Sequence, residues 1–210
     1  MANLTDLTSK EFLAELASAA PAPGGGGGAA MAGALAAALS SMVCNLTLGK
    51  EKFAAQEAEV QAVLAQAEKA RVRLLELVQE DAAVFNSFMS CYKLPKATDE
   101  EKAARTAAIR AAAKQAAEVP LAIAREAFVV LQMAEKIAVI GNPGVITDSA
   151  CSGLLARAAL RCAEYNVRIN LGLTKDEEWN AQVAGELAQM LAEAVKLESS
   201  LLAATDKALA

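Results

Sequence analysis

The chain of 210 residues contains no histidine. This absence excludes Ser-His-Asp and Cys-His nucleophile systems, His-ligated metal sites, and histidine as a general base. Any acid–base chemistry must therefore come from carboxylates, lysines, tyrosines or bound water. A basic stripe is also absent: the formal net charge is −5 and the pI is about 5.0. Nucleic acid is therefore not expected as a partner.

Aromatic residues are scarce as well, at 4% of the chain, whereas alanine supplies about a quarter of it. Alanine is the best helix former and a poor strand former, so an all-β fold is excluded and helices are expected throughout. The length suits one domain with its own core, and no repeat or interdomain linker divides residues 1–210.

The four cysteines are widely spaced and form no C-x-x-C pair. They are Cys44, Cys91, Cys151 and Cys162. The N-terminus, MANLTDLTSKEF, is polar and carries no targeting pattern. Isolated thiols of this kind are typical of reduced cytosolic proteins, so we expect a cytoplasmic location.

No charged residue occurs between Glu15 and Lys50. Within this stretch, residues 29–48 are about long enough to cross a bilayer. They are dominated by Ala, Gly and Ser, which gain little from lipid and allow helix backbones to approach closely. A central helix buried by its neighbours explains this composition better than a membrane span, so no membrane association is expected.

Three capping boxes mark helix starts, at Thr8 to Glu11, Thr98 to Glu101 and Thr174 to Glu177. Gly49 is expected to stop a helix, and Pro120 to kink or break one. The predicted helices span about residues 9–19, 29–48, 51–93, 98–140, 147–171, and 174 to near the C-terminus. The fold class is therefore all-α: an up-and-down bundle of about five long helices plus a short N-terminal one.

A glycine run, Gly24 to Gly28, follows Pro21 and Pro23. Glycines allow a ligand to touch the backbone, and free N–H groups at a helix start attract anions. The run lacks the Lys-Ser/Thr of a P-loop and follows a helix rather than a strand. Composition alone leaves two interpretations open, a ligand-binding loop or a flexible hinge.

Asp81 falls in register with an apolar stripe of the 51–93 helix, between Val78 and Phe85. A carboxylate on such a stripe is either paired with a cation or used, because burying an isolated charge is expensive. Desolvation would raise its pKa toward the range useful for a general acid or base. An ion pair to a neighbouring helix is the alternative interpretation.

Further polar candidates lie in and after the turn that begins at Gly141. Asp148 occupies the first turn of a predicted helix, where a carboxylate also serves simply to start the helix. Asn142 is by default a turn residue. Asn166 and Asn170 lie one turn apart on one helix face and suit a flat polar heterocycle, or else satisfy each other or a neighbouring helix end.

In this order, the motifs resemble those of the cyclodeaminase / methenyltetrahydrofolate cyclohydrolase family. The resemblance spans essentially the whole chain. The matching stretches are 13–18, Pro21-Ala-Pro-Gly-Gly-Gly26, 33–39, Met42-Val43, Leu46-Thr47, Asp81-Ala-Ala-Val-Phe85, Leu94-Pro-Lys-Ala-Thr98, Gly141-Asn-Pro143, Thr147-Asp148 and Asn166-Val-Arg-Ile-Asn-Leu171. One departure is visible: the family usually has serine after the three glycines, where this chain has Gly27 and Gly28.

The resemblance implies a helical, homodimeric enzyme of folate one-carbon metabolism. Members hydrolyse 5,10-methenyltetrahydrofolate to 10-formyltetrahydrofolate, or cyclise 5-formiminotetrahydrofolate with loss of ammonia. We expect the hydrolysis, because the chain carries no formiminotransferase domain, and keep the cyclodeaminase as the alternative. A non-catalytic helical module that binds a partner helix or a membrane is the alternative from another class.

The resemblance also suggests roles for individual residues. Asp148 is the preferred general acid/base and Asp81 the second candidate, with no metal and no tightly bound cofactor. The remaining candidates would contact the folate through backbone, amide or cationic groups. They are Pro23, Gly24, Gly25, Gly26, Gly27, Asn142, Asn166 and Asn170. From their charge alone, Lys50, Lys136 and Arg168 are candidate partners of the folate glutamate tail.

Overall fold

The computed structural model describes residues 3–210, and this part of the chain is helical and contains no strand. One short helix precedes five long ones, and three 3-10 turns lie between or before them. The elements are η1 (Leu4–Asp6), α1 (Ser9–Leu16), α2 (Gly25–Asn45), η2 (Glu51–Gln56), α3 (Glu57–Cys91), α4 (Asp99–Ile140), η3 (Pro143–Val145), α5 (Ile146–Thr174) and α6 (Glu177–Leu209).

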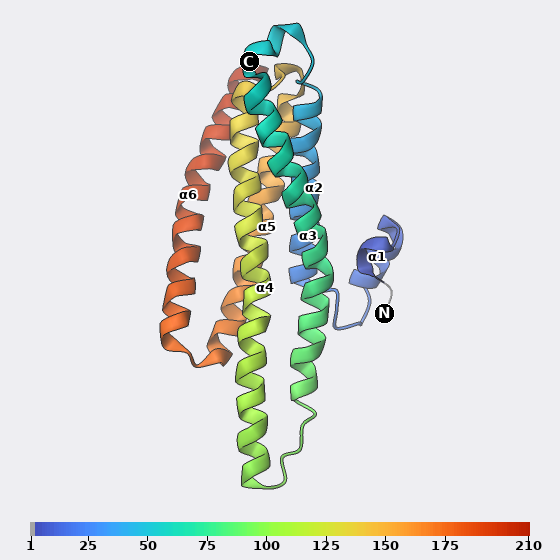
Figure 1. The fold of residues 1–210 in the computed structure, drawn as a ribbon, viewed down its shortest axis with the longest axis vertical. Coiled ribbons are helices and arrows are strands. Elements are labelled where there is room, and N and C mark those ends of the chain that lie inside the picture. Colours follow the sequence, from blue (N-terminus) through green and yellow to red (C-terminus); the bar gives the residue numbers. More distant parts are fainter. Residues whose placement is uncertain (1–2) are drawn as a thin grey trace.

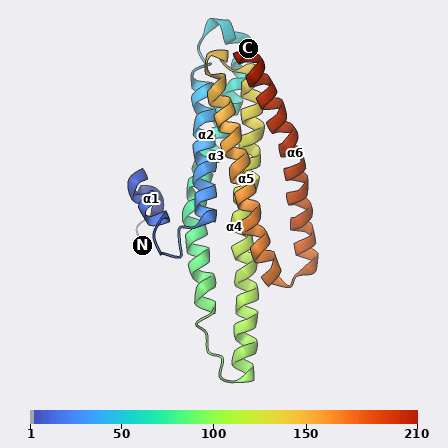
Figure 2. The same ribbon diagram turned by 180° about the vertical axis from the view of Figure 1, so that it is seen from behind.

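The five long helices run alternately up and down (Figures 1 and 2). Helix α2 packs against α3, α4 and α5, and α6 covers the outside of α4 and α5. The short α1 lies beside the five long helices (Figure 1), with Phe12 buried in the core. The preceding η1 is joined to α3 by a hydrogen bond from the Leu4 N–H to Gln79 Oε1 at 2.9 Å. The predicted all-α, up-and-down bundle is confirmed.

Helix α2 is the central helix that its small residues predict. Its Gly33 faces Leu74 of α3, where a Cβ would come within 3.1 Å of the leucine side chain. Across α5, the Ser40 and Ser152 hydroxyls lie 2.8 Å apart, and Ser152 donates to the Ala36 carbonyl at 2.7 Å. By length and hydropathy α2 qualifies as a membrane span, yet 61% of its most apolar window is buried inside the bundle. The protein core therefore accounts for this apolar stretch.

Two of the three predicted capping boxes are present at helix starts. Thr8 with Glu11 and Thr98 with Glu101 form complete capping boxes. At α6 the cap is Asp176, whose carboxylate accepts from the Trp179 N–H, so the predicted box at Thr174 is wrong. The reason is that α5 continues past Gly172 to Thr174 and ends where Lys175 takes a left-handed conformation with φ of 58°.

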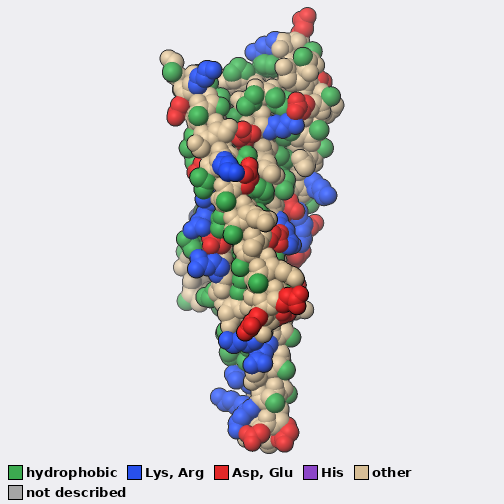
Figure 3. Space-filling view, turned by 90° about the vertical axis from the view of Figure 1, so that its left-hand side faces the viewer, with side chains coloured by type: hydrophobic (Ala, Val, Ile, Leu, Met, Phe, Trp, Pro, Cys, Tyr) green, Lys and Arg blue, Asp and Glu red, His purple; other side chains and the backbone are tan. Residues whose placement is uncertain are grey.

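The glycine run is helical rather than a loop. Helix α2 begins at Gly25, four residues before the predicted start at Ala29. Helix α4 is likewise continuous through Pro120, where a kink or break is predicted. Beyond the start of α2, the ends of α3 and α4 project as a narrow arm (Figure 1). Its tip carries both acidic and basic side chains (Figure 3).

Candidate active site

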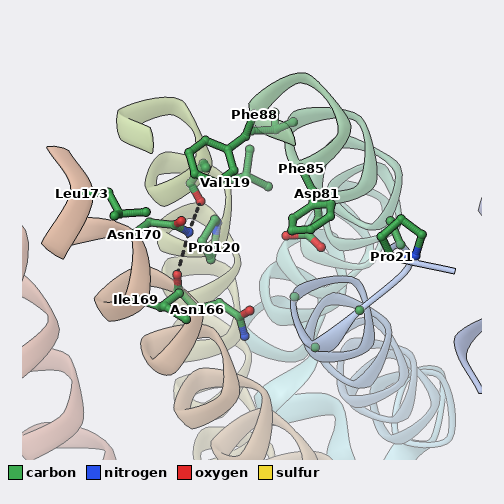
Figure 4. A pocket seen from close by; sticks show the side chains of 16 residues that line it. Pro21, Asp81, Phe85, Phe88, Val119, Pro120, Asn166, Ile169, Asn170 and Leu173 are labelled. Carbon is green, nitrogen blue, oxygen red and sulfur yellow. Dashed lines mark hydrogen bonds between the residues drawn. The ribbon is translucent and has the colours of Figure 1, made fainter. Parts of the chain in front are cut away.

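A cavity of about 360 Å³ lies where the start of α2 meets the middle of α4, the second half of α3 and the last turns of α5 (Figure 4). This volume is in the range of small-molecule sites. Its walls are formed by Pro21, Ala22, Gly24, Gly25, Gly26, Asp81, Val84, Phe85, Phe88, Ala116, Val119, Pro120, Asn166, Ile169, Asn170 and Leu173. Asp81 is the one ionisable side chain among these lining residues.

Asp81 projects from α3 toward the first turn of α2 (Figure 4). Burial raises the pKa of its carboxyl above the usual 3.8, because desolvation disfavours the charged form. The Gly27 N–H opposes this rise by hydrogen bonding to the carboxylate. No ion pair to Asp81 occurs among residues 3–210, so the structure does not support the alternative of an interhelical ion pair.

Glycine is required where α2 meets this carboxyl group. A Cβ at Gly26 would overlap the Asp81 carboxylate, lying 2.7 Å from its Cγ. Gly24, the N-cap residue, offers no side-chain cap to the helix, and the first helical bond runs from Gly28 N–H to the Gly24 carbonyl at 2.9 Å. The N–H groups of the first turn are therefore left to Asp81 and to whatever occupies the cavity.

The two asparagines predicted to share a helix face both line the cavity from α5. Asn166 donates to the Cys162 carbonyl at 2.8 Å, and its amide lies near Gly25 of α2, where a Cβ would be 3.5 Å from Nδ2. Asn170 donates to the Ala116 carbonyl of α4 at 2.8 Å and to the Asn166 carbonyl at 2.9 Å. The pair thus spans the floor between α2 and α4.

Four of the predicted site residues lie at the opposite end of the bundle: Asp148, Lys136, Lys50 and Asn142. Asp148 is 18 residues before Asn166 on the same helix, roughly 27 Å away at 1.5 Å per residue. Lys136 is 16 residues from Pro120 on α4, roughly 24 Å by the same rise, and pairs with Glu59 at 2.6 Å.

Two more of these residues belong to that far end. Lys50 precedes η2 beyond the C-terminus of α2. Asn142 caps that same end: its N–H donates to Thr47 Oγ1 at 2.9 Å and its amide to the Leu46 carbonyl at 3.1 Å. None of these side chains reaches the cavity of its own chain, because the bundle keeps its two ends apart.

Three predicted residues, Pro23, Gly27 and Arg168, lie near the cavity without lining it. Pro23 is buried behind Gly27, with the Pro23 Cβ 3.4 Å from where a Gly27 Cβ would be. Arg168 is exposed on α5, 3.3 Å from Glu164.

In the described part of the chain, no three acidic or thiol side chains lie close enough together to hold a metal ion.

Sequence profiles place the chain among known proteins. The profile of the formiminotransferase-cyclodeaminase family matches residues 8–206. The chain belongs to this family. The resemblance that the ordered motifs predict is thereby confirmed.

Relatives of two kinds are similar over most of the chain. The methenyltetrahydrofolate cyclohydrolase of Methylorubrum extorquens is 45% identical over 194 residues, covering 92% of this chain and 93% of that protein. The formimidoyltransferase-cyclodeaminase of Sus scrofa is 33% identical over 193 residues, which is 92% of this chain but 36% of the pig protein. The chain therefore spans little more than a third of that second relative.

The fold is shared with a solved member of the family. The crystal structure of formiminotetrahydrofolate cyclodeaminase from Thermotoga maritima matches with a TM-score of 0.88 at 28% identity. The match covers 99% of this chain and 100% of that one. The proteins named here are enzymes, and this family member has the same helical arrangement.

The sequence did not single out the apolar walls of the cavity. Phe85 and Phe88 follow Asp81 on its stripe of α3, and Phe88 meets Tyr92 edge-on with ring centroids 5.3 Å apart. Ile169 and Leu173 come from α5, where Ile169 is 72% exposed. The register of the α3 aromatics with Asp81 was a usable signal, whereas nothing in the sequence indicates which side of α4 faces them.

Proposed function

We propose that this protein hydrolyses 5,10-methenyltetrahydrofolate to 10-formyltetrahydrofolate, with Asp81 as both general base and general acid. The observation that carries the proposal is the position of Asp81. It is the sole ionisable group lining a cavity of small-molecule size, and its pKa is raised. The cyclohydrolase name of the Methylorubrum extorquens relative supports the choice of reaction.

The chemistry asks for one proton carrier. The methenyl carbon is an amidinium carbon and already electrophilic, so we propose that no tightly bound cofactor takes part. The Asp81 carboxylate takes a proton as water adds to that carbon. It then returns that proton to N5 as the carbon–N5 bond breaks. The remaining hydroxyl proton is released to solvent as the C=O of the formyl group forms on N10, which balances the positive charge of the substrate. A carboxylate whose pKa is raised suits both steps, because it accepts and donates protons more readily near neutral pH.

The walls suit a folate. Phe85 and Phe88 offer apolar surface to an aromatic ring system, and the asparagine pair offers its side-chain oxygens to a polar heterocycle. The glycines at the start of α2 let the reacting end approach the backbone beside Asp81. A carboxylate facing the cavity also favours the cationic methenyl substrate.

The cyclodeaminase reaction is the second candidate, supported by the names of the Sus scrofa and Thermotoga maritima proteins. In that reaction the protein would act as an ammonia lyase, closing the ring of 5-formiminotetrahydrofolate. Asp81 would then protonate the departing nitrogen.

Two assays on the purified protein separate the candidates. Loss of the ultraviolet absorption of methenyltetrahydrofolate measures hydrolysis, and release of ammonia from the formimino compound measures cyclodeamination. We expect acceleration of the first. Acceleration of the second alone assigns the lyase reaction, and acceleration of neither leaves a non-catalytic binding module.

We further propose a homodimer located in the cytoplasm. Leu35, Met42 and Leu46 are exposed along one face of α2, by 55%, 44% and 36%. An apolar row of this kind is typical of an association surface, and a second copy would cover it. Light scattering that gives only monomer at micromolar concentration contradicts the dimer.

All four cysteines are free, which supports the proposed cytoplasmic location, because the cytoplasm is a reducing compartment.

A further inference from the structure

Helix α4 has a missing hydrogen bond in the wall of the cavity. Pro120 has no N–H, so it cannot supply the i→i−4 bond that the Ala116 carbonyl would otherwise accept. Both residues line the cavity, together with Val119. A carbonyl left without a donor at this point would favour local opening of α4, because even a half-buried acceptor without a partner is unfavourable.

Asn170 of α5 supplies the missing donor. Its amide lies 2.8 Å from the Ala116 oxygen and 2.9 Å from the Asn166 oxygen of its own helix (Figure 4). One side chain thereby ties α4 to α5 at the break. Both N–H groups of this amide are used, which also fixes the orientation of its oxygen.

We propose that Asn170 is a positioning residue, which sets the α4 wall of the cavity by replacing the hydrogen bond that Pro120 removes. This inference rests on the proposed function. It assigns Asn170 a task distinct from that of Asp81: the asparagine holds the wall against which the folate packs, and the aspartate, on α3, moves the proton. Because Asn170 hydrogen bonds to Ala116 and Asn166 and not to Asp81, loss of its amide should weaken substrate binding more than it slows the chemical step.

The structure offers a double-mutant cycle to test this. In Pro120→Ala the new N–H at position 120 can donate to the Ala116 carbonyl, so the wall no longer depends on Asn170. We expect Asn170→Leu alone to raise KM about tenfold while kcat changes less than about threefold. In the Pro120→Ala background the same change should raise KM no more than about threefold. The pH dependence of kcat should be the same in all four proteins.

Asn180 provides a matched control, because its amide also donates to an α5 carbonyl, that of Leu171, at 2.9 Å, but outside the cavity. Asn180→Leu should lower thermal stability without raising KM. Circular dichroism establishes that each variant is folded, and Asn170→Ser replaces Asn170→Leu if the larger side chain prevents folding.

Equal effects of the Asn170 change in the two backgrounds overturn the inference, since a residue that only contacted substrate would not depend on position 120. Coupling in unfolding free energy without coupling in KM overturns it too. A wild-type protein inactive toward both folates overturns the proposed function and this inference together. An active wild-type protein without the coupling overturns this inference alone, so the two failures are distinguishable.

Discussion

The two ends of the bundle carry similar polar residues but use them differently. At the far end, Asn142 donates from its amide and its N–H to Leu46 and Thr47, directly after α2, and Lys136 pairs with Glu59. At the cavity end, α2 starts without a side-chain cap, and Asp81 faces the glycines without an ion pair. The far end uses these polar groups to stabilise the fold, whereas the cavity end leaves Asp81 and the first-turn N–H groups of α2 available to a ligand.

The largest expected effect comes from replacing each of the two candidate acids, Asp81 and Asp148, by asparagine and comparing the two variants. Asp81→Asn should lower kcat for methenyltetrahydrofolate by about 10²–10⁴-fold, because the amide cannot accept the proton from water. Asp148→Asn, at the other end, should stay within about twofold of wild type. Steady-state assays of the two purified variants measure this. A severe loss in Asp148→Asn with an active Asp81→Asn would reverse the roles of the ends.

A second prediction separates two glycines of the same helical turn. Gly26→Ala places a Cβ against the Asp81 carboxylate, and the overlap should cost about 1–3 kcal/mol of stability and displace the acid. Activity should fall with it. Gly28→Ala meets no atom within 4 Å, so it should retain activity and gain about 0.5–1 kcal/mol. Thermal unfolding and turnover are measured on both; equal behaviour would contradict the close contact at Gly26.

Much of the fold could be predicted from local sequence signals. The capping boxes at Thr8 and Thr98 mark helix starts because their hydrogen bonds join residues three apart. The first turn of α2 could not be predicted in this way, since glycine disfavours helix and only packing against α3 explains it. Asp81 could be found from its register with the α3 stripe, because burial follows helical periodicity.

The preference for Asp148 shows what a local pattern omits. A polar turn at a helix start looks functional whichever end of the bundle holds it. The predicted helix over 147–171 nevertheless contains both Asp148 and Asn166, and its length alone separates them by roughly 27 Å. The sequence could therefore have excluded one cavity containing both residues of one chain. The hydrogen bond from Asn170 to the Ala116 carbonyl, by contrast, depends on how α4 packs on α5, which local patterns do not show.

A third prediction concerns the far end alone. Asn142→Ala removes the hydrogen bond from the side-chain amide to the Leu46 carbonyl. It also removes the acceptor for the Gly144 N–H, 3.1 Å away. The loss should cost about 1–2 kcal/mol, as for other capping residues, and leave kcat and KM unchanged. Chemical denaturation combined with the hydrolysis assay checks both halves. A change in KM would indicate that this end also serves the substrate.

The smallest expected effect reveals the cost of leaving Asp81 available. Its carboxyl has a pKa above 3.8 in the folded protein, so the folded state binds a proton there more tightly than the unfolded state does. Below pH 3.8 both states are protonated and burial carries no charge penalty. As the pH rises from 3.8 through the folded pKa, the unfolded state loses its proton first, so the stability contributed by this group falls. Asp81→Asn removes that penalty.

The melting temperature of Asp81→Asn should therefore exceed that of wild type by a few degrees at pH 7, and the difference should vanish at low pH. Asp148→Asn, measured alongside, controls for loss of one negative charge at the far end. A gain for Asp81→Asn that persists at low pH would mean that the amide packs better for reasons other than charge. A gain confined to higher pH indicates a carboxyl that the fold keeps at the expense of stability, as expected of a group retained for chemistry.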